Sequence, residues 1–118
     1  MTDEAEGYAD LGMWREAWDA LEALPPEERA TPAALRARLR CCPGLGSWDV
    51  GEYVAKLLSD GGKADRASAA AFYMLLAVYH AKSGNREPAE EAIGKAVSAW
   101  PEIRADLIDE PALREVIF

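Results

Sequence analysis

Apolar residues recur along this chain at intervals of three and four positions, the spacing that places side chains on one face of an α-helix. Alanine, leucine, glutamate and arginine, which all favour helices, are frequent, and no segment alternates apolar and polar residues over the length of a strand. The pattern therefore predicts an all-α protein. Helices are expected at roughly residues 3–11, 13–24, 32–42, 48–59, 66–82, 86–99 and 111–117.

Residues that start or stop helices stand between these segments. Thr31 can cap the N-terminus of a helix that has Pro32 at its first position, and Asn85 can cap the helix that follows it. Gly61 stands where a C-terminal stop is expected. The connections are short, so neighbouring helices should pack antiparallel.

One phrase nearly repeats, because "LGMW" begins at Leu11 and "LGSW" begins at Leu45. The interval matches a period of about 34 residues, which is typical of structural repeats made of paired helices. A third copy follows at a slightly longer interval, because the insertion "GGKA" precedes it, and it has Gly84 in the glycine position. In that copy Arg86 replaces the tryptophan. The regular spacing therefore predicts a helical repeat.

The third copy carries the clearest repeat signature, and the chain resembles the tetratricopeptide repeat (TPR) family. The matching positions are Tyr73, Leu76, Ala77, His80, Gly84, Ala89, Ile93, Ala96 and Pro101. The phrases "EGY-x-x-LGM", "LEALPPE" and "Asp-x-Pro-x-Leu" are also similar to those of small bacterial TPR proteins. The resemblance implies one domain over residues 1–118, with repeats at about 1–30, 31–64 and 66–101 and a capping segment at 102–118.

The fold that this resemblance implies is a right-handed superhelical array of three helix hairpins plus a C-terminal capping helix. Arg38 falls in an apolar slot of the second repeat, and Leu39 falls in a small-residue slot, so we expect that hairpin to be splayed. The last repeat needs a cover for its apolar edge. The candidates for the covering face are Leu113, Val116, Ile117 and Phe118.

The formal net charge of −8 argues against binding to nucleic acid or to an anionic membrane surface. The first residues contain neither a basic segment nor an apolar one, so we expect no signal peptide. Cys41 and Cys42 are adjacent, which disfavours a disulfide between them. Reduced thiols fit a cytoplasmic protein best.

The chain offers little for catalysis, and we predict no enzyme activity and no catalytic, cofactor-binding or metal-binding residues. His80 is the sole histidine, and no motif pairs it with a nucleophile. Gly44 and Gly46 lack the lysine and the third glycine of a phosphate loop, so a turn between helices explains them. An enzyme or small-ligand protein that uses His80 and Cys42 stays an alternative.

The four tryptophans allow two interpretations. They pack between helices, where an indole buries a large area, or they form an aromatic ledge that binds a partner. The residues concerned are Trp14, Trp18, Trp48 and Trp100.

The resemblance also implies a partner-binding groove, because TPR proteins bind peptides or helices on the face lined by the first helix of each hairpin. Carried onto this chain, the groove contains Arg36, Arg40, Met74, Val78 and Lys82. The arginines could bind a carboxylate, and Met74 with Val78 would form an apolar patch. Alternatively, the arginines pair internally with Glu6 and Asp10. The residues of the chaperone-binding carboxylate clamp are absent.

The sequence therefore predicts a non-enzymatic protein–protein interaction module that binds a peptide or helix of unknown identity. One alternative is a small TPR-type chaperone that protects a helical partner. Another is a self-associating scaffold, such as a homodimer formed through the short first helix. These alternatives stay open at the level of sequence.

Overall fold

The computed structural model describes residues 1–118, and every regular element in it is a helix. The chain forms two compact units, Met1–Val54 and Ala55–Phe118. The prediction of an all-α fold is confirmed. The prediction of one domain over residues 1–118 stays a prediction, as does the superhelical arrangement of its hairpins.

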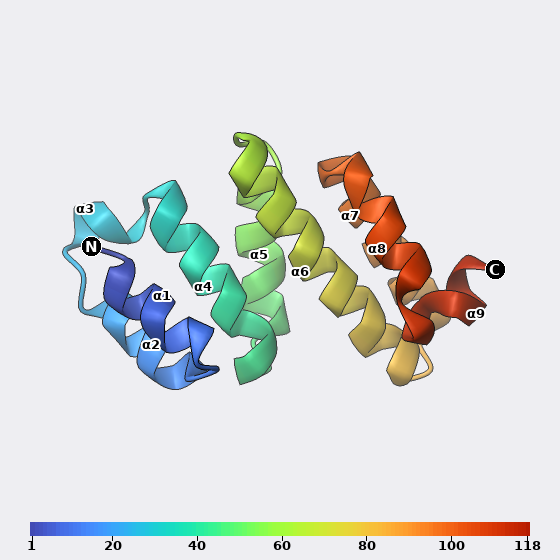
Figure 1. The fold of residues 1–118 in the computed structure, drawn as a ribbon, viewed down its shortest axis with the longest axis horizontal. Helices are drawn as coiled ribbons and strands as arrows, with labels where there is room; N and C mark the ends of the chain where they lie inside the picture. Colours follow the sequence, from blue (N-terminus) through green and yellow to red (C-terminus); the bar gives the residue numbers. More distant parts are fainter. The chain divides into compact units, whose positions relative to one another are not determined.

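The first unit is built around an antiparallel hairpin of α1 (Asp3–Asp10) and α2 (Trp14–Glu22) (Figure 1). The short α3 (Pro26–Arg29) leads into α4 (Pro32–Leu45), which packs against α2. The helices approach closely because small residues face the core of the unit. The buried core residues include Ala5, Ala9, Ala17, Leu21, Ala34, Ala37 and Cys41.

Helix α5 (Trp48–Leu58) begins in the first unit and ends in the second. The second unit is dominated by α6 (Lys63–Lys82) and α7 (Arg86–Ala99), which pack along each other through buried alanines. Two 3₁₀ turns, Pro101–Ile103 and Pro111–Leu113, flank α8 (Arg104–Asp109), and α9 (Arg114–Ile117) ends the chain. None of the helices combines the length and the apolar character needed to cross a membrane.

The repeated phrase of the sequence is a repeated joint between helices. The three joint glycines adopt left-handed backbone angles, with φ of 73°, 68° and 78°, which side chains disfavour. The next residue donates its N–H to the carbonyl oxygen five positions earlier, a common way to end a helix. The glycines are Gly12, Gly46 and Gly84, and the bonds are Met13 to Tyr8 (2.9 Å), Ser47 to Cys42 (2.9 Å) and Asn85 to His80 (2.8 Å).

Some helix boundaries lie a few residues from the rough positions predicted for them. Helix α4 continues through Pro43 to Leu45, since a proline in the last turn removes only one backbone donor. Helix α6 begins at Lys63 instead of residue 66, because the second glycine of the insertion is already its N-cap. Helices α3 and α8 were not predicted, and at four and six residues they are too short to show a periodic pattern.

The predicted caps had mixed outcomes. Thr31 caps α4, since its hydroxyl oxygen accepts a hydrogen bond from the Ala34 N–H at 3.2 Å. Asn85 is the N-cap residue of α7, as predicted, but its side chain makes no capping hydrogen bond. After α5 ends at Leu58, the Gly61 N–H donates to the Leu58 carbonyl oxygen (3.0 Å), as expected of a stop.

The predicted C-terminal cover was partly wrong. Leu113 is fully buried, and Val116 and Ile117 are half-buried. Phe118 is 81% exposed and therefore covers nothing. The segment 111–117 is a 3₁₀ turn followed by one turn of α-helix, because the pattern of apolar residues does not distinguish these two geometries.

Candidate functional site

The five residues predicted to line a groove lie on two helices. Arg36 and Arg40 belong to α4 in the first unit, and Met74, Val78 and Lys82 belong to α6 in the second. Each helix places its own set on one face, because the members are four residues apart. A groove that joins the two sets stays a prediction.

Arg40 is engaged within the first unit. Its Nη2 atom lies 2.9 Å from Oδ1 of Asp10, so α4 is tied to the last turn of α1. Both side chains are exposed, which makes the ion pair weak and exchangeable. The internal pairing considered at the sequence level is therefore present at Arg40. Arg36 is half-buried one turn earlier on the same helix.

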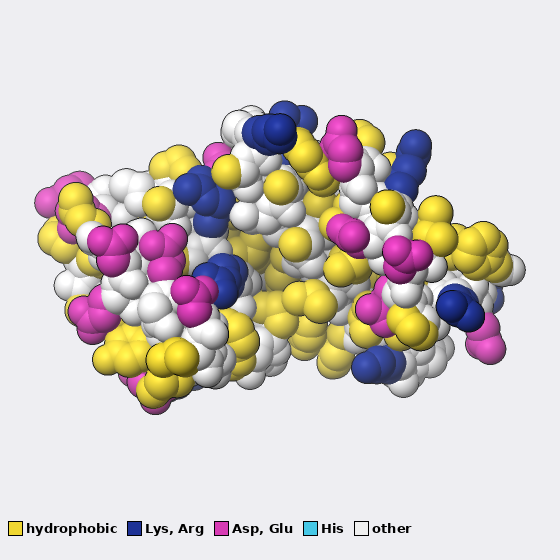
Figure 2. Space-filling model, viewed as in Figure 1, with side chains coloured by type: hydrophobic (Ala, Val, Ile, Leu, Met, Phe, Trp, Pro, Cys, Tyr) yellow, Lys and Arg dark blue, Asp and Glu magenta, His cyan; other side chains and the backbone are white.

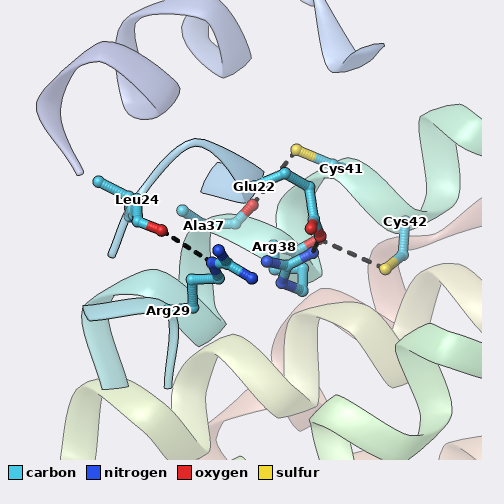
Figure 3. Close-up of polar contacts among 7 residues, drawn as sticks. All are labelled: Glu22, Leu24, Arg29, Ala37, Arg38, Cys41 and Cys42. Carbon is cyan, nitrogen blue, oxygen red and sulfur yellow. Dashed lines mark hydrogen bonds and ion pairs between the residues drawn. The ribbon is translucent and has the colours of Figure 1, made fainter. Parts of the chain in front are cut away.

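Arg38 is held by two partners on α2, as Figure 3 shows for its acidic partner. Its Nη1 atom lies 2.7 Å from Oε1 of Glu22, and its guanidinium carbon lies 4.4 Å from the centre of the Trp18 ring. Only 13% of the Arg38 side chain is exposed. The apolar slot thus holds an arginine because an indole covers its flat face and a carboxylate neutralises its charge.

The face of α6 is mostly apolar. Met74 and Val78 are half-buried, and Leu75 is 45% exposed beside them. Lys82, one turn beyond Val78, is exposed and supplies a positive charge at the end of this face. Figure 2 shows hydrophobic side chains gathered over the middle of α6.

The two cysteines are buried in α4 and bonded to their own helix (Figure 3). The Cys41 and Cys42 thiols donate to the carbonyl oxygens of Ala37 and Arg38, each at 3.4 Å. Burial raises the pKa of Cys42 to about 11, with a further contribution from Cys41, while Arg38 opposes the shift. Burial also raises the pKa of Cys41. Both groups are therefore thiols at neutral pH, and thiols are poor nucleophiles.

His80 lies near the end of α6 and is half-buried. Its Nδ1 atom is buried without a hydrogen-bond partner, and its ring centre lies 5.5 Å from that of Tyr79. No side chain therefore orients the ring through Nδ1, as the third group of a nucleophile–base pair would. No group of three or more histidine, cysteine or acidic side chains is placed to hold a metal ion.

Three tryptophans serve as packing surfaces inside their units. Trp18 stacks under Arg38, and Trp100 has the Lys63 Nζ and Arg66 guanidinium carbon 5.7 and 5.5 Å from its ring centre. Trp14 lies against Gly44, and a Cβ atom at that glycine would clash with the five-membered ring of the indole. These contacts favour the packing interpretation over a binding ledge.

Gly44 was assigned to a turn from the sequence, and that assignment was wrong. Gly44 lies inside α4, and its missing side chain makes room for Trp14. Only Gly46, two residues later, is the turn glycine. The tryptophan at the start of α2 and the glycine near the end of α4 therefore form one packing contact.

Sequence reasoning missed two apolar side chains on the surface of the first unit. Leu11 is 75% exposed and Met13 is 38% exposed, on either side of the joint glycine Gly12. The signal that could have found them is a comparison among the three joints. The third joint has Ser83 and Asn85 in the corresponding positions.

Comparison of the chain with protein-family models, with curated proteins and with solved structures gave no match.

Proposed function

We propose that this protein is a non-enzymatic protein-binding module, a helical repeat similar to TPR proteins whose hairpins form a right-handed superhelical array. The support is the joint that occurs at Gly12, Gly46 and Gly84 with the same backbone geometry and the same hydrogen bond. The first two joints are separated by the TPR period of about 34 residues, and the third follows after the "GGKA" insertion. Such arrays generally present extended binding surfaces.

The observation that carries the binding proposal is the face of α6. Leu75 is substantially exposed next to Val78, and Lys82 follows one turn later. A partner helix or an extended peptide would place apolar side chains on Leu75 and Val78, with a carboxylate near Lys82. Helix-in-groove recognition uses apolar anchors at such helical spacing.

The arginines of α4 would offer a second contact to the partner, within the first unit. On binding, Arg40 would leave the Asp10 carboxylate and form an ion pair with a carboxylate of the partner. This exchange is inexpensive, because an exposed ion pair contributes only about 0–1 kcal/mol. Arg36, on the same face of α4, would add a second cation.

The chemistry of the possible nucleophiles supports a role without catalysis. Cys42 is buried and its pKa is raised to about 11, which keeps the thiol protonated at neutral pH. His80 has no hydrogen-bond partner on its buried Nδ1 atom that would orient it as a base.

Capture of partners from a lysate of the source organism tests the proposal. The wild-type chain serves as bait beside two variants, Arg36→Glu with Arg40→Glu and Leu75→Ser with Lys82→Glu. Ile108→Ser is the matched control, since Ile108 is 50% exposed on α8. A protein retained by the wild type and the control, and lost from both variants at equal helicity, supports the proposal. Retention by all four baits refutes it.

A further inference from the structure

The first joint exposes apolar side chains that the joint itself does not require. Leu11 and Met13 flank Gly12, and their exposed fractions are 75% and 38%. The third joint makes the same backbone hydrogen bond with Ser83 and Asn85 in these positions. Polar residues are therefore compatible with the turn. The second joint has Leu45 in the position of Leu11, but Leu45 packs on a buried cluster, whereas Leu11 is left mostly exposed. We call Leu11 and Met13 the apolar tip.

The residue that follows the apolar tip is firmly packed in the first unit. Trp14, the next residue after Met13, packs on the buried cluster of Ala9, Ala17 and Cys41. Its indole is further fixed against the backbone of Gly44. The tip is thus held at the end of a rigid helix hairpin, so a partner that docks there loses little entropy to loop ordering.

The surface next to the tip is acidic. Residues 1–30 contain nine acidic and two basic side chains. Asp10 and Glu22 are neutralised by arginines of α4, whereas Glu16 and Asp19 are exposed on α2 with no ion pair. Arg15, also exposed on α2, is the one basic residue of the α1–α2 hairpin, which therefore keeps an acidic balance. Figure 2 shows the acidic side chains gathered over the α1–α2 hairpin. We call Glu16 and Asp19, which are three residues apart on one face, the acidic flank.

We propose that the apolar tip and the acidic flank dock a basic amphipathic helix of a partner protein. The partner places an apolar side chain on Leu11 and Met13 and sets lysine or arginine side chains, one helical turn apart, against Glu16 and Asp19.

The acidic charge of the α1–α2 hairpin favours a basic helix over two other possible occupants of this site. A second copy of the chain would bring the same acidic hairpin to the contact, and like charges would oppose the pairing. An anionic membrane surface would be repelled for the same reason. This site belongs to the first unit, whereas α6 belongs to the second, and it does not depend on the proposed function.

Binding of synthetic helices to the full chain tests the inference by fluorescence anisotropy. The probe is a labelled peptide of leucine, lysine and alanine with the leucines on one helix face. Two further probes have the leucines replaced by alanine or the lysines replaced by glutamate. The key variant is Leu11→Ser with Met13→Asn, which installs the residues of the third joint and leaves every charge unchanged. Val50→Ser is the control, because Val50 is 44% exposed elsewhere in the first unit.

The leucine–lysine probe should bind the wild type and the Val50→Ser control equally, and at least about tenfold more weakly to the tip variant. Replacing Glu16 and Asp19 by glutamine and asparagine should weaken binding and reduce its dependence on salt. Equal affinity of the tip variant and the wild type would overturn the proposal, as would equal binding of the glutamate probe. A wild-type dimer that the tip substitutions dissociate in sedimentation would identify a second copy as the occupant and would also overturn it.

Discussion

The indole of Trp14 lies against the backbone of Gly44, in the space that a side chain on that residue would occupy. The contact ties the start of α2 to the last turn of α4 within the first unit. It explains the tryptophan of the first "LG-x-W" phrase and the glycine that directly precedes the second phrase. The tryptophan packs, and the glycine that accommodates it stands two residues before the joint glycine Gly46.

Replacing Gly44 by alanine should therefore destabilise the protein. The new methyl group must displace the indole, and overpacking of this kind costs about 1–3 kcal/mol of the free energy of unfolding. Gly94→Ala is the matched control, since Gly94 lies within α7 with open space around it and the change should add about 0.5–1 kcal/mol. Urea denaturation measures both. Equal stability of the two variants would contradict the packing contact.

Arg38 and Arg40 should contribute differently to stability although both make ion pairs. Arg38 is mostly buried between Glu22 and Trp18, so a double-mutant cycle between Arg38 and Trp18 should give a coupling of about 0.5–2 kcal/mol. The coupling between Arg40 and Asp10, both exposed, should be about 0–1 kcal/mol and should vanish in high salt. Equal couplings with equal salt dependence would contradict the structure.

The cysteines should resist alkylation in the folded protein. Because burial raises the pKa of Cys42 to about 11, the fraction of thiolate at neutral pH is very small. Iodoacetamide should label native protein slowly at pH 7, and the rate should keep rising up to about pH 11, whereas denatured protein should level off near the ordinary pKa of 9.0. Rapid native labelling at pH 7 would contradict the burial of both thiols.

The same shift in pKa affects stability in a definite direction. The folded state holds the Cys42 proton more tightly than the unfolded state does. The resulting stability is complete below pH 9 and is lost as the pH rises from 9 towards 11, because the unfolded chain releases the proton first. Cys42→Ala should remove this part of the alkaline destabilisation in a series of thermal melts.

Most helices could be predicted because the spacing of the apolar residues and the positions of the helix-breaking residues agree. Thr31 with Pro32 marks the start of α4, and the joint glycines mark the ends of α1, α4 and α6. The missed details depend on contacts that a linear pattern does not contain. Pro43 stays inside α4, and Gly44 is needed only because Trp14, on a different helix, packs on it.

The candidate site was harder to predict for a related reason. The spacing of Arg36 and Arg40 indicates a shared helix face, but not which carboxylate lies opposite. Asp10 forms an ion pair with Arg40, whereas Arg38 forms an ion pair with Glu22 and stacks on the ring of Trp18. The exposure of Leu11 and Met13 also depends on which side of the hairpin is covered, and the sequence alone leaves that open.

The most direct test of the central claim, that α6 presents a protein-binding face, is a calorimetric titration with the partner recovered by capture. The wild type, the Leu75→Ser/Lys82→Glu variant and the Ile108→Ser control are compared at equal helicity by circular dichroism. The dissociation constant should rise at least about tenfold for the α6 variant, because it loses both an apolar anchor and a cation, and should stay unchanged for the control. An unchanged dissociation constant for the α6 variant would contradict binding at this face.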